Sequence, residues 1–203
     1  LAGEILKALL QNHDEISDLS KWTADEYAPW AGLPDFLDAH RIQQIRLAAL
    51  LHDIGHGPFS HASEGIMPAR QELMKKNKLP SFLVEALNSR SESLRAKGEN
   101  HVDADHEDYS LLIAWRILTD IMDGHSFLNE NYIRDVLAFK FGFVVPSNPA
   151  NKPIFELFRN FVDGEFDSDR MDYLLRDSYF CGVPYGNYDL VRLLEGLYVL
   201  ERK

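Results

Sequence analysis

Three histidines and an aspartate lie within the ten residues 52–61. His52 and Asp53 are adjacent, and His56 and His61 follow in a turn that contains two glycines. Imidazole and carboxylate together suit divalent metals such as Mn, Fe, Ni and Zn, and a carboxylate also accepts Mg. Because glycine permits a sharp turn, the adjacent pair can offer one nitrogen and one oxygen to the same ion. The segment therefore predicts a helix end that brings ligands into a pocket.

A second polar constellation lies far along the chain, at residues 167–177. This segment opens with an N-cap residue, Asp167 or Ser168, and contains no Gly or Pro, so it is predicted to be a helix. Helical spacing brings five of its polar side chains onto one face, while its apolar residues point elsewhere. These five are Asp169, Asp172, Tyr173, Arg176 and Asp177.

Taken together, the two segments resemble the HD superfamily of metal-dependent phosphohydrolases. The likeness rests on HDIGHGPFSH at 52–61 and DSDRMDYLLRD at 167–177, and it runs from Leu1 to about Leu193. It is strongest to the deoxynucleoside triphosphate triphosphohydrolases, which release a deoxynucleoside and intact triphosphate. The resemblance implies a divalent metal ion (Mn, Mg, Fe, Ni or Zn) held by His52, Asp53 and Asp169.

The fourth protein ligand of that family is not found in this sequence. It belongs to an Arg-Phe-Glu-His-like segment that would precede Leu1, so we expect the chain to be truncated at its N-terminus and possibly at its C-terminus. His13 and His40 are the histidines that could substitute for it. Three protein ligands and a water would also make a plausible site.

The resemblance also assigns acid–base and phosphate-contacting roles. It implies that His106 is a proton donor oriented by Glu107, because a departing nucleoside alkoxide needs a proton. The alternative is a helix N-terminus capped by Asp105. His56 and His61 are implied to contact phosphate or assist the leaving group; alternatively, they only form hydrogen bonds that shape the turn.

The substrate-binding residues are implied by the same likeness. Tyr173 would pack against the deoxyribose and Asp177 would accept from its 3'-hydroxyl, with Tyr185 and more weakly Asp189 in the pocket wall. Aromatic core packing is the alternative for Tyr185. Arg170 and Arg176 either contact phosphate or pair with acidic residues of the same helix surface, which are Asp167, Asp172 and Glu165.

Composition sets limits on the class of protein. A chain of 203 residues can bury one sizeable core, so we expect a single domain over residues 1–203. Cys181 is the only cysteine, which excludes an internal disulfide and favours the cytoplasm. The net charge of -11 argues against broad nucleic-acid binding. No apolar run approaches the length of a membrane span, so no membrane association is expected.

Apolar periodicity predicts helices before His52 and at 109–118, 129–141 and 153–162. The fold class expected is all-α, an HD-type helical bundle with at most a minor β element, for which 141–145 is the one candidate. Residues 89–105 are polar and predicted to be a surface excursion. Within it, His101, Asp103 and Asp105 resemble a loop metal site, although a solvated acidic loop is the favoured interpretation.

The function predicted is metal-dependent hydrolysis of a deoxynucleoside triphosphate by a homo-oligomeric enzyme. Two alternatives stay open. The first is an HD phosphohydrolase for nucleoside monophosphates, cyclic nucleotides or guanosine polyphosphates. The second is a catalytically silent nucleotide-binding or sensor module.

Overall fold

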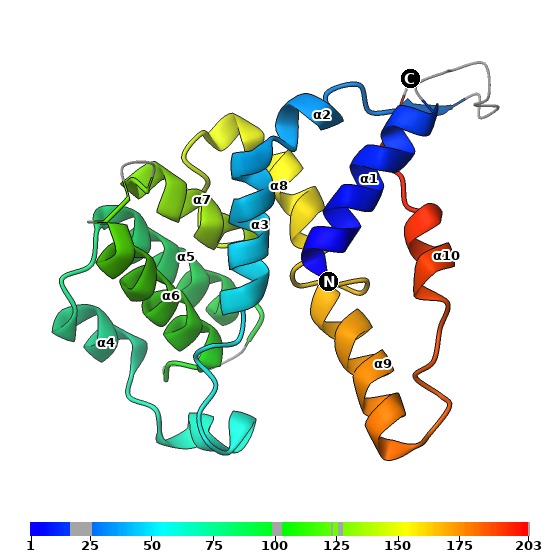
Figure 1. Cartoon of the computed structure of the whole chain (residues 1–203). Helices are drawn as coiled ribbons and strands as arrows, with labels where there is room; N and C mark the ends of the chain where they lie inside the picture. The colour runs from blue at the N-terminus through cyan, green and yellow to red at the C-terminus, as the bar shows by residue number, and fades with distance from the viewer. Residues whose placement is uncertain (17–25, 99–102, 123, 126–127, 203) are drawn as a thin grey trace. The chain divides into compact units, whose positions relative to one another are not determined.

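The computed structural model describes residues 1–203 apart from 17–25, 99–102, 123, 126–127 and 203 (Figure 1). The described residues are mostly helical and contain one small two-stranded sheet, which confirms the all-α fold with a minor β element. They divide into two compact units, residues 1–46 with 160–203 and residues 47–159. The helix α3 (Ala39–Leu51) begins in the first unit and ends in the second.

The first unit combines both ends of the chain. Besides the start of α3, it contains α1 (Ala2–Ile16), β1 (Tyr27–Pro29), α2 (Leu33–Phe36), α9 (Ser168–Cys181), α10 (Leu190–Glu195) and β2 (Leu200–Arg202). The two strands pair antiparallel, with Tyr27 opposite Arg202.

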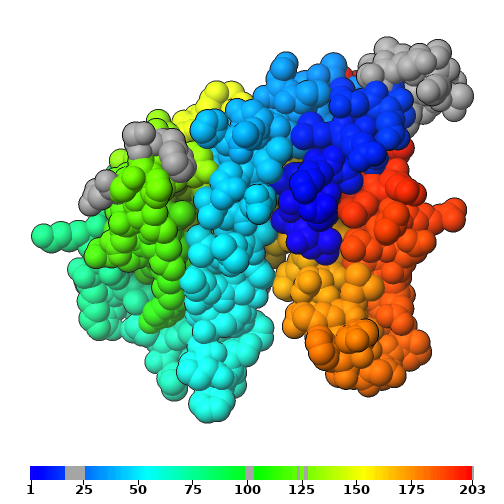
Figure 2. Space-filling view, viewed as in Figure 1, coloured from blue at the N-terminus to red at the C-terminus, as the bar shows by residue number. Residues whose placement is uncertain are grey.

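The helix α1 is amphipathic and provides much of this unit's core. Ile5, Leu6 and Leu9 are fully or almost fully buried, because their spacing places them on one face of the helix. Asn12 then donates hydrogen bonds to the carbonyls of Leu194 and Leu197, both at 2.8 Å. These bonds tie the end of α10 to α1, and the two helices lie side by side (Figures 1 and 2).

The helix α9 begins and ends with standard caps. The Asp167 carboxylate accepts from the Arg170 amide at 2.6 Å, which confirms the predicted N-cap. Gly182 ends the helix in the left-handed conformation, with a φ of 66°. The Tyr188 hydroxyl donates to the Met171 carbonyl at 2.7 Å and so holds the following segment against α9.

The second unit contains the end of α3 and a set of helices. These are the 3-10 helix η2 (Ser60–Ile66), α4 (Arg70–Lys76), α5 (Ser81–Ala96), α6 (His106–Met122), α7 (Glu130–Lys140), the 3-10 helix η3 (Pro149–Asn151) and α8 (Lys152–Arg159). Its core is formed by α5, α6 and α7, with Leu87, Leu111 and Val136 almost completely excluded from solvent. The rings of Phe139 and Phe155 stack at 4.1 Å and join α7 to α8.

Two expectations from the sequence were wrong. Residues 141–145 form a turn and not a strand, because Phe141 and Val144 are buried as parts of the loop that follows α7. Residues 89–96 belong to α5 and are not part of a surface excursion. Arg90 within them is buried, since its charge is balanced by Asp105, which precedes α6, and by Asp108 of α6.

Candidate active site

The end of α3 delivers His52 and Asp53 to the surface of the second unit. Nδ1 of His52 lies 2.9 Å from the carbonyl oxygen of Ala49. Because a carbonyl only accepts, Nδ1 carries the proton and Nε2 is the nitrogen able to bind a metal. That Nε2 lies 3.4 Å from Oδ2 of Asp53, so a nitrogen and an oxygen of adjacent residues point to the same region, as the sequence predicted.

The turn after this pair is packed against the start of α6. The Gly55 amide donates to the Ser110 hydroxyl at 2.9 Å. A Cβ at position 55 would lie 2.1 Å from the Ser110 nitrogen and 2.4 Å from the His106 oxygen. Only glycine therefore fits this contact between the turn and the first turn of α6.

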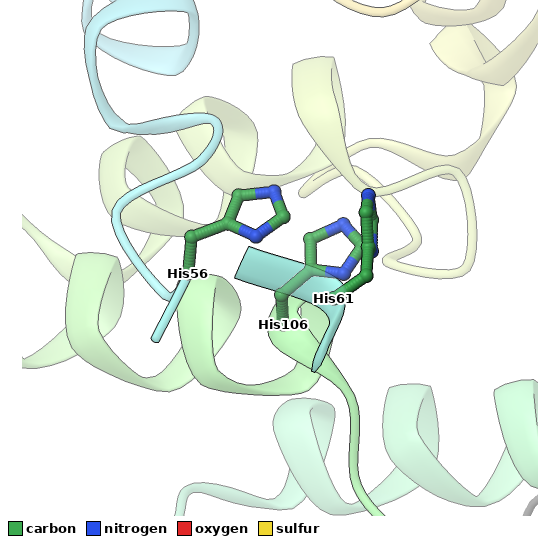
Figure 3. Close-up of side chains that lie close together, drawn as sticks. All are labelled: His56, His61 and His106. Atoms are coloured by element: carbon green, nitrogen blue, oxygen red, sulfur yellow. The ribbon is translucent and has the colours of Figure 1, made fainter. Parts of the chain in front are cut away.

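That contact brings three histidines together from separate elements. His56 comes from the turn, His61 from η2 and His106 from the first position of α6, and their rings point toward one another (Figure 3). The rings of His56 and His106 stack at 4.1 Å with an angle of 8°, and His61 meets both edge-on at 5.0 Å. Each of the three offers a nitrogen within 4.8 Å of the others. We call these three residues the histidine cluster.

Glu64 joins two members of the histidine cluster. Its Oε1 lies 2.5 Å from Nδ1 of His106 and 3.0 Å from Nδ1 of His61. Partial burial would raise the pKa of this carboxyl, but the hydrogen bonds from His106 and His61 outweigh that effect and lower it. Glu64 is therefore ionised at neutral pH and fixes Nδ1 of both rings as donors.

His56 has a different electrostatic environment. Burial lowers its pKa, and the neighbouring His106 and His61 lower it further, while the Asp53 carboxylate opposes them. Oδ2 of Asp53 lies 3.5 Å from Nε2 of His56. Asp53 thus connects the His52–Asp53 pair to the histidine cluster.

This set of donors fits a divalent metal ion. Imidazole nitrogens and carboxylate oxygens are ligands that Zn, Mn, Fe and Ni accept. A histidine oriented by a carboxylate is also the usual arrangement for proton transfer to a leaving group. The described part of this unit therefore gathers side chains of the types that can bind a metal ion and transfer protons.

Comparison with protein families identifies the family of this chain. The HD domain family model matches residues 5–135, more than half of the 203 residues. The chain belongs to the HD domain family.

Curated relatives of this HD-domain chain are considerably longer. It is 30% identical over 165 residues to the uncharacterized protein YwfO of Bacillus subtilis, covering 80% of this chain and 27% of that protein. It is 28% identical over 160 residues to the deoxynucleoside triphosphate triphosphohydrolase SAMHD1 of Homo sapiens, covering 77% and 23%. The protein of that name from Gallus gallus is 28% identical over 170 residues, covering 77% and 24%. The chain thus spans about a quarter of the length of these relatives. No solved structure matches it significantly.

In this HD-domain chain, the segment around His106 shows the helix N-terminus that was the alternative interpretation, and the acid–base role of His106 stays a prediction. Asp105 caps α6, because its Oδ1 accepts from the amides of Glu107 at 3.0 Å and Asp108 at 3.2 Å. His106 nevertheless lies in the histidine cluster. The Glu107 carboxylate is bonded to Arg90, so the carboxylate that contacts His106 is that of Glu64.

The segment that resembles a loop metal site in sequence, with His101, Asp103 and Asp105, uses Asp105 to bind Arg90. Both carboxylate oxygens of Asp105 lie 2.8 Å from Arg90 nitrogens. Asp103 is exposed, and His101 lies outside the described residues. Asp105 is thus part of an ion network.

The predicted substrate-binding residues lie in the first unit, mostly on α9. Arg176 pairs with Asp172 at 3.0 Å, as the ion-pair alternative predicted, and also with Asp177 at 3.6 Å. Arg170 donates to the Glu165 carbonyl at 3.4 Å. Tyr173 is half-buried on the same helix, and Asp169 lies in its first turn. That Asp169 joins His52 and Asp53 around a metal stays a prediction.

The remaining predicted positions are at the surface or in α1 and α3. Tyr185 is 86% exposed and follows α9, so it is not a core residue. His13 is half-buried near the end of α1, and His40 is exposed in the first turn of α3.

Among the residues that the structure describes, no helix is both long and apolar enough to cross a membrane.

Proposed function

We propose that this HD domain is the catalytic part of a metal-dependent phosphohydrolase that converts a deoxynucleoside triphosphate to a deoxynucleoside and triphosphate. The observation that carries the proposal is the histidine cluster, joined by Glu64 on one side and by Asp53 on the other. The name of the SAMHD1 relatives supports the choice of substrate. A homo-oligomer remains a prediction, which light scattering of the purified chain tests.

His52, Asp53 and Asp169 would hold the metal ion. When bound there, a divalent ion would supply Lewis-acid stabilisation of a phosphoryl oxygen and would activate a water. Asp53 is suited to this role because its Oδ2 lies beside nitrogens of both His52 and His56.

His106 is the proton donor in this proposal. Hydrolysis forms a bond between a water oxygen and the α-phosphorus and breaks the bond from that phosphorus to O5' of the nucleoside. The departing alkoxide needs a proton, which Nε2 of His106 would supply while Glu64 holds Nδ1. His56, kept neutral by its lowered pKa, can donate one hydrogen bond to a phosphoryl oxygen without a charge.

Analysis of the products tests the proposal. The chain is incubated with dGTP and Mn²⁺, and the products are separated by ion-exchange chromatography. Deoxyguanosine and tripolyphosphate in equal amounts are expected. Pyrophosphate or orthophosphate as the only inorganic product would instead place the chain with another class of HD phosphohydrolase. Binding of dGTP without any product would indicate a sensor module.

A substitution at Asp53 tests the metal site separately. Asp53→Ala should remove bound Mn²⁺ while the helix content stays nearly unchanged, because the side chain contributes little to the core. Asp120→Ala is the matched control, since Asp120 is an exposed aspartate of α6 that pairs only with Arg116 among the contacts described for it. Full retention of Mn²⁺ by Asp53→Ala would contradict the assignment.

A further inference from the structure

The first turn of α6 is held by a buried network of ions. Nη1 of Arg90 lies 2.8 Å from Oδ1 of Asp105 and 2.6 Å from Oδ1 of Asp108. Nη2 of Arg90 lies 2.8 Å from Oδ2 of Asp105 and also bonds Glu107. On the other side, Nε of Arg70 lies 2.8 Å from Oδ2 of Asp108. Three helices, α4, α5 and α6, and Asp105 in the segment before α6 are thus joined through two guanidinium groups.

The centre of this network is excluded from water, whereas the side chains of Asp105 and Glu107 are partly exposed. The side chain of Asp108 is completely buried, and those of Arg70 and Arg90 are exposed by only 3% and 9%. Burial alone would lower the pKa of Arg90, but the surrounding carboxylates raise it well above its ordinary value. The guanidinium also lies 5.1 Å from the ring centre of Phe143. Buried charges are tolerated only with well-placed partners, so the network allows the first turn of α6 little freedom.

His106 lies between the acidic residues that bind Arg90. Asp105, Glu107 and Asp108 all bind Arg90, whereas His106 points into the histidine cluster. The turn that follows His52 and Asp53 also holds α6, because the Gly55 amide of that turn donates a hydrogen bond to the Ser110 hydroxyl. The first turn of α6, which carries His106, is therefore fixed by the ion pairs with Arg90 of α5 and by the close backbone contact with Gly55.

We propose that Arg90, Asp108 and Arg70 are positioning residues for His106. They hold the first turn of α6 at the place where Nδ1 of His106 meets Oε1 of Glu64 and where its ring stacks on His56. The proposal rests on the proposed function only in that His106 takes part in the reaction. The hydrogen bond between His106 and Glu64 is observable without any substrate.

Arg90→Lys is the variant that tests this proposal. It keeps the positive charge, but an ammonium lacks the planar fork that reaches three carboxylates at once. The matched control is Arg134→Lys on α7, because Arg134 also donates to a structural acceptor, the Val145 carbonyl at 2.6 Å, and lies 5.4 Å from the ring centre of Phe82. Both variants thus lose a guanidinium with an aromatic neighbour, and only one of them acts on α6.

Two measurements are made on each protein. The first is the NMR resonance of the His106 Nδ1 proton in the hydrogen bond to Glu64, assigned by its absence in His106→Gln. The second is kcat and KM for dGTP with Mn²⁺. We expect Arg90→Lys to lose the resonance and at least tenfold in kcat while KM changes by less than about twofold. Arg134→Lys should keep the His106 resonance and should leave kcat and KM unchanged.

The outcomes separate the two proposals. An Arg90→Lys protein that keeps the resonance and kcat overturns the positioning role. Loss of the resonance without loss of kcat supports the positioning role and contradicts the part given to His106 in the reaction. If the unmodified chain does not hydrolyse dGTP, the proposed function fails and the resonance still decides the positioning role. Should Arg90→Lys not fold, Arg70→Lys, which leaves every Arg90 contact in place, is measured and judged in the same way.

Discussion

Nδ1 of His106 and Oε1 of Glu64 lie 2.5 Å apart, although the two residues are 42 positions apart in sequence. The same carboxylate oxygen lies 3.0 Å from Nδ1 of His61. A single acidic group therefore sets the orientation of two imidazoles that come from different helices. This arrangement leaves Nε2 of each ring as the atom that can face a substrate.

Replacing Glu64 with Gln should lower the turnover of dGTP by about tenfold to a hundredfold. The amide has the same shape but no charge, so it no longer stabilises a proton shared with His106. Metal content should stay normal, because Glu64 is not among the residues proposed to hold the ion. The measurement is a steady-state rate with metal analysis of the same sample.

Glu72→Gln is the control for this substitution. Glu72 lies on α4, is half-exposed and pairs with Lys76 at 2.8 Å. Its replacement should leave turnover unchanged. Equal losses in both variants would show that Glu64 has no special role.

Gly55→Ala should destabilise the chain by about 1 to 3 kcal/mol, because the added methyl group overlaps with backbone atoms of α6. Gly65→Ala provides the comparison, since a Cβ there meets nothing within 4 Å. Urea unfolding of both variants gives the free energies. A stability of Gly55→Ala equal to that of Gly65→Ala would mean that the turn and α6 are farther apart than described.

His56 should titrate below its ordinary pKa of 6.5 in the metal-free protein, mainly because it is partly buried and also because His106 lies beside it. Asp53→Asn should lower the pKa of His56 further, since the Asp53 carboxylate raises this pKa more than the Glu64 carboxylate does. NMR titration of the ring protons measures both values. An upward shift in Asp53→Asn would contradict the electrostatic account.

The same shift has a consequence for stability. Between the lowered pKa and 6.5 the unfolded chain binds more protons at this residue than the folded chain. The free energy of unfolding of the metal-free protein should therefore decrease as the pH falls below 6.5. Glu64 should decrease the free energy of unfolding further as the pH falls below 4.5, because its pKa in the folded chain is also below that ordinary value.

Tyr173→Ala should narrow the preference for deoxynucleotides. If Tyr173 packs on the sugar, a 2'-hydroxyl would be buried without a partner, at a cost of about 1 to 3 kcal/mol, so dGTP should be preferred to GTP by about tenfold or more. Comparing the two hydrolysis rates in both proteins is the test. Equal rates with the unmodified chain would exclude this role.

Tyr179→Ala is the control on the same helix. Its side chain is 80% exposed and packs on Phe180, at the end of α9. It should leave the ratio of the two rates unchanged.

The sequence predicted the elements whose periodicity is strong. The predicted helix at 129–141 corresponds to α7, where Asn129 is the N-cap, and the predicted N-cap Asp167 opens α9. The strand at 141–145 was wrong because a short apolar run does not distinguish a strand from a buried turn. The pairing of β1 with β2 was not predictable, since each strand has three residues and they lie far apart in sequence.

Within the site, the local motif was informative and the tertiary partners were not. The family resemblance gave His56, His61 and His106 roles in one reaction, and the structure brings the three side chains together. Glu64 was missed, although its position three residues after His61 on a helical turn was a usable signal. Arg90 could not be placed, because polarity in its segment predicted exposure and only the carboxylates of α6 explain its burial.

One guanidinium bound to three acidic side chains has an evolutionary consequence. A change of Arg90 alone would leave three carboxylates facing one another, and a change of any one acid alters the balance for the other two. Positions 90, 105, 107 and 108 should therefore vary together among related sequences, whereas exposed pairs such as Lys7 with Glu4 should drift independently.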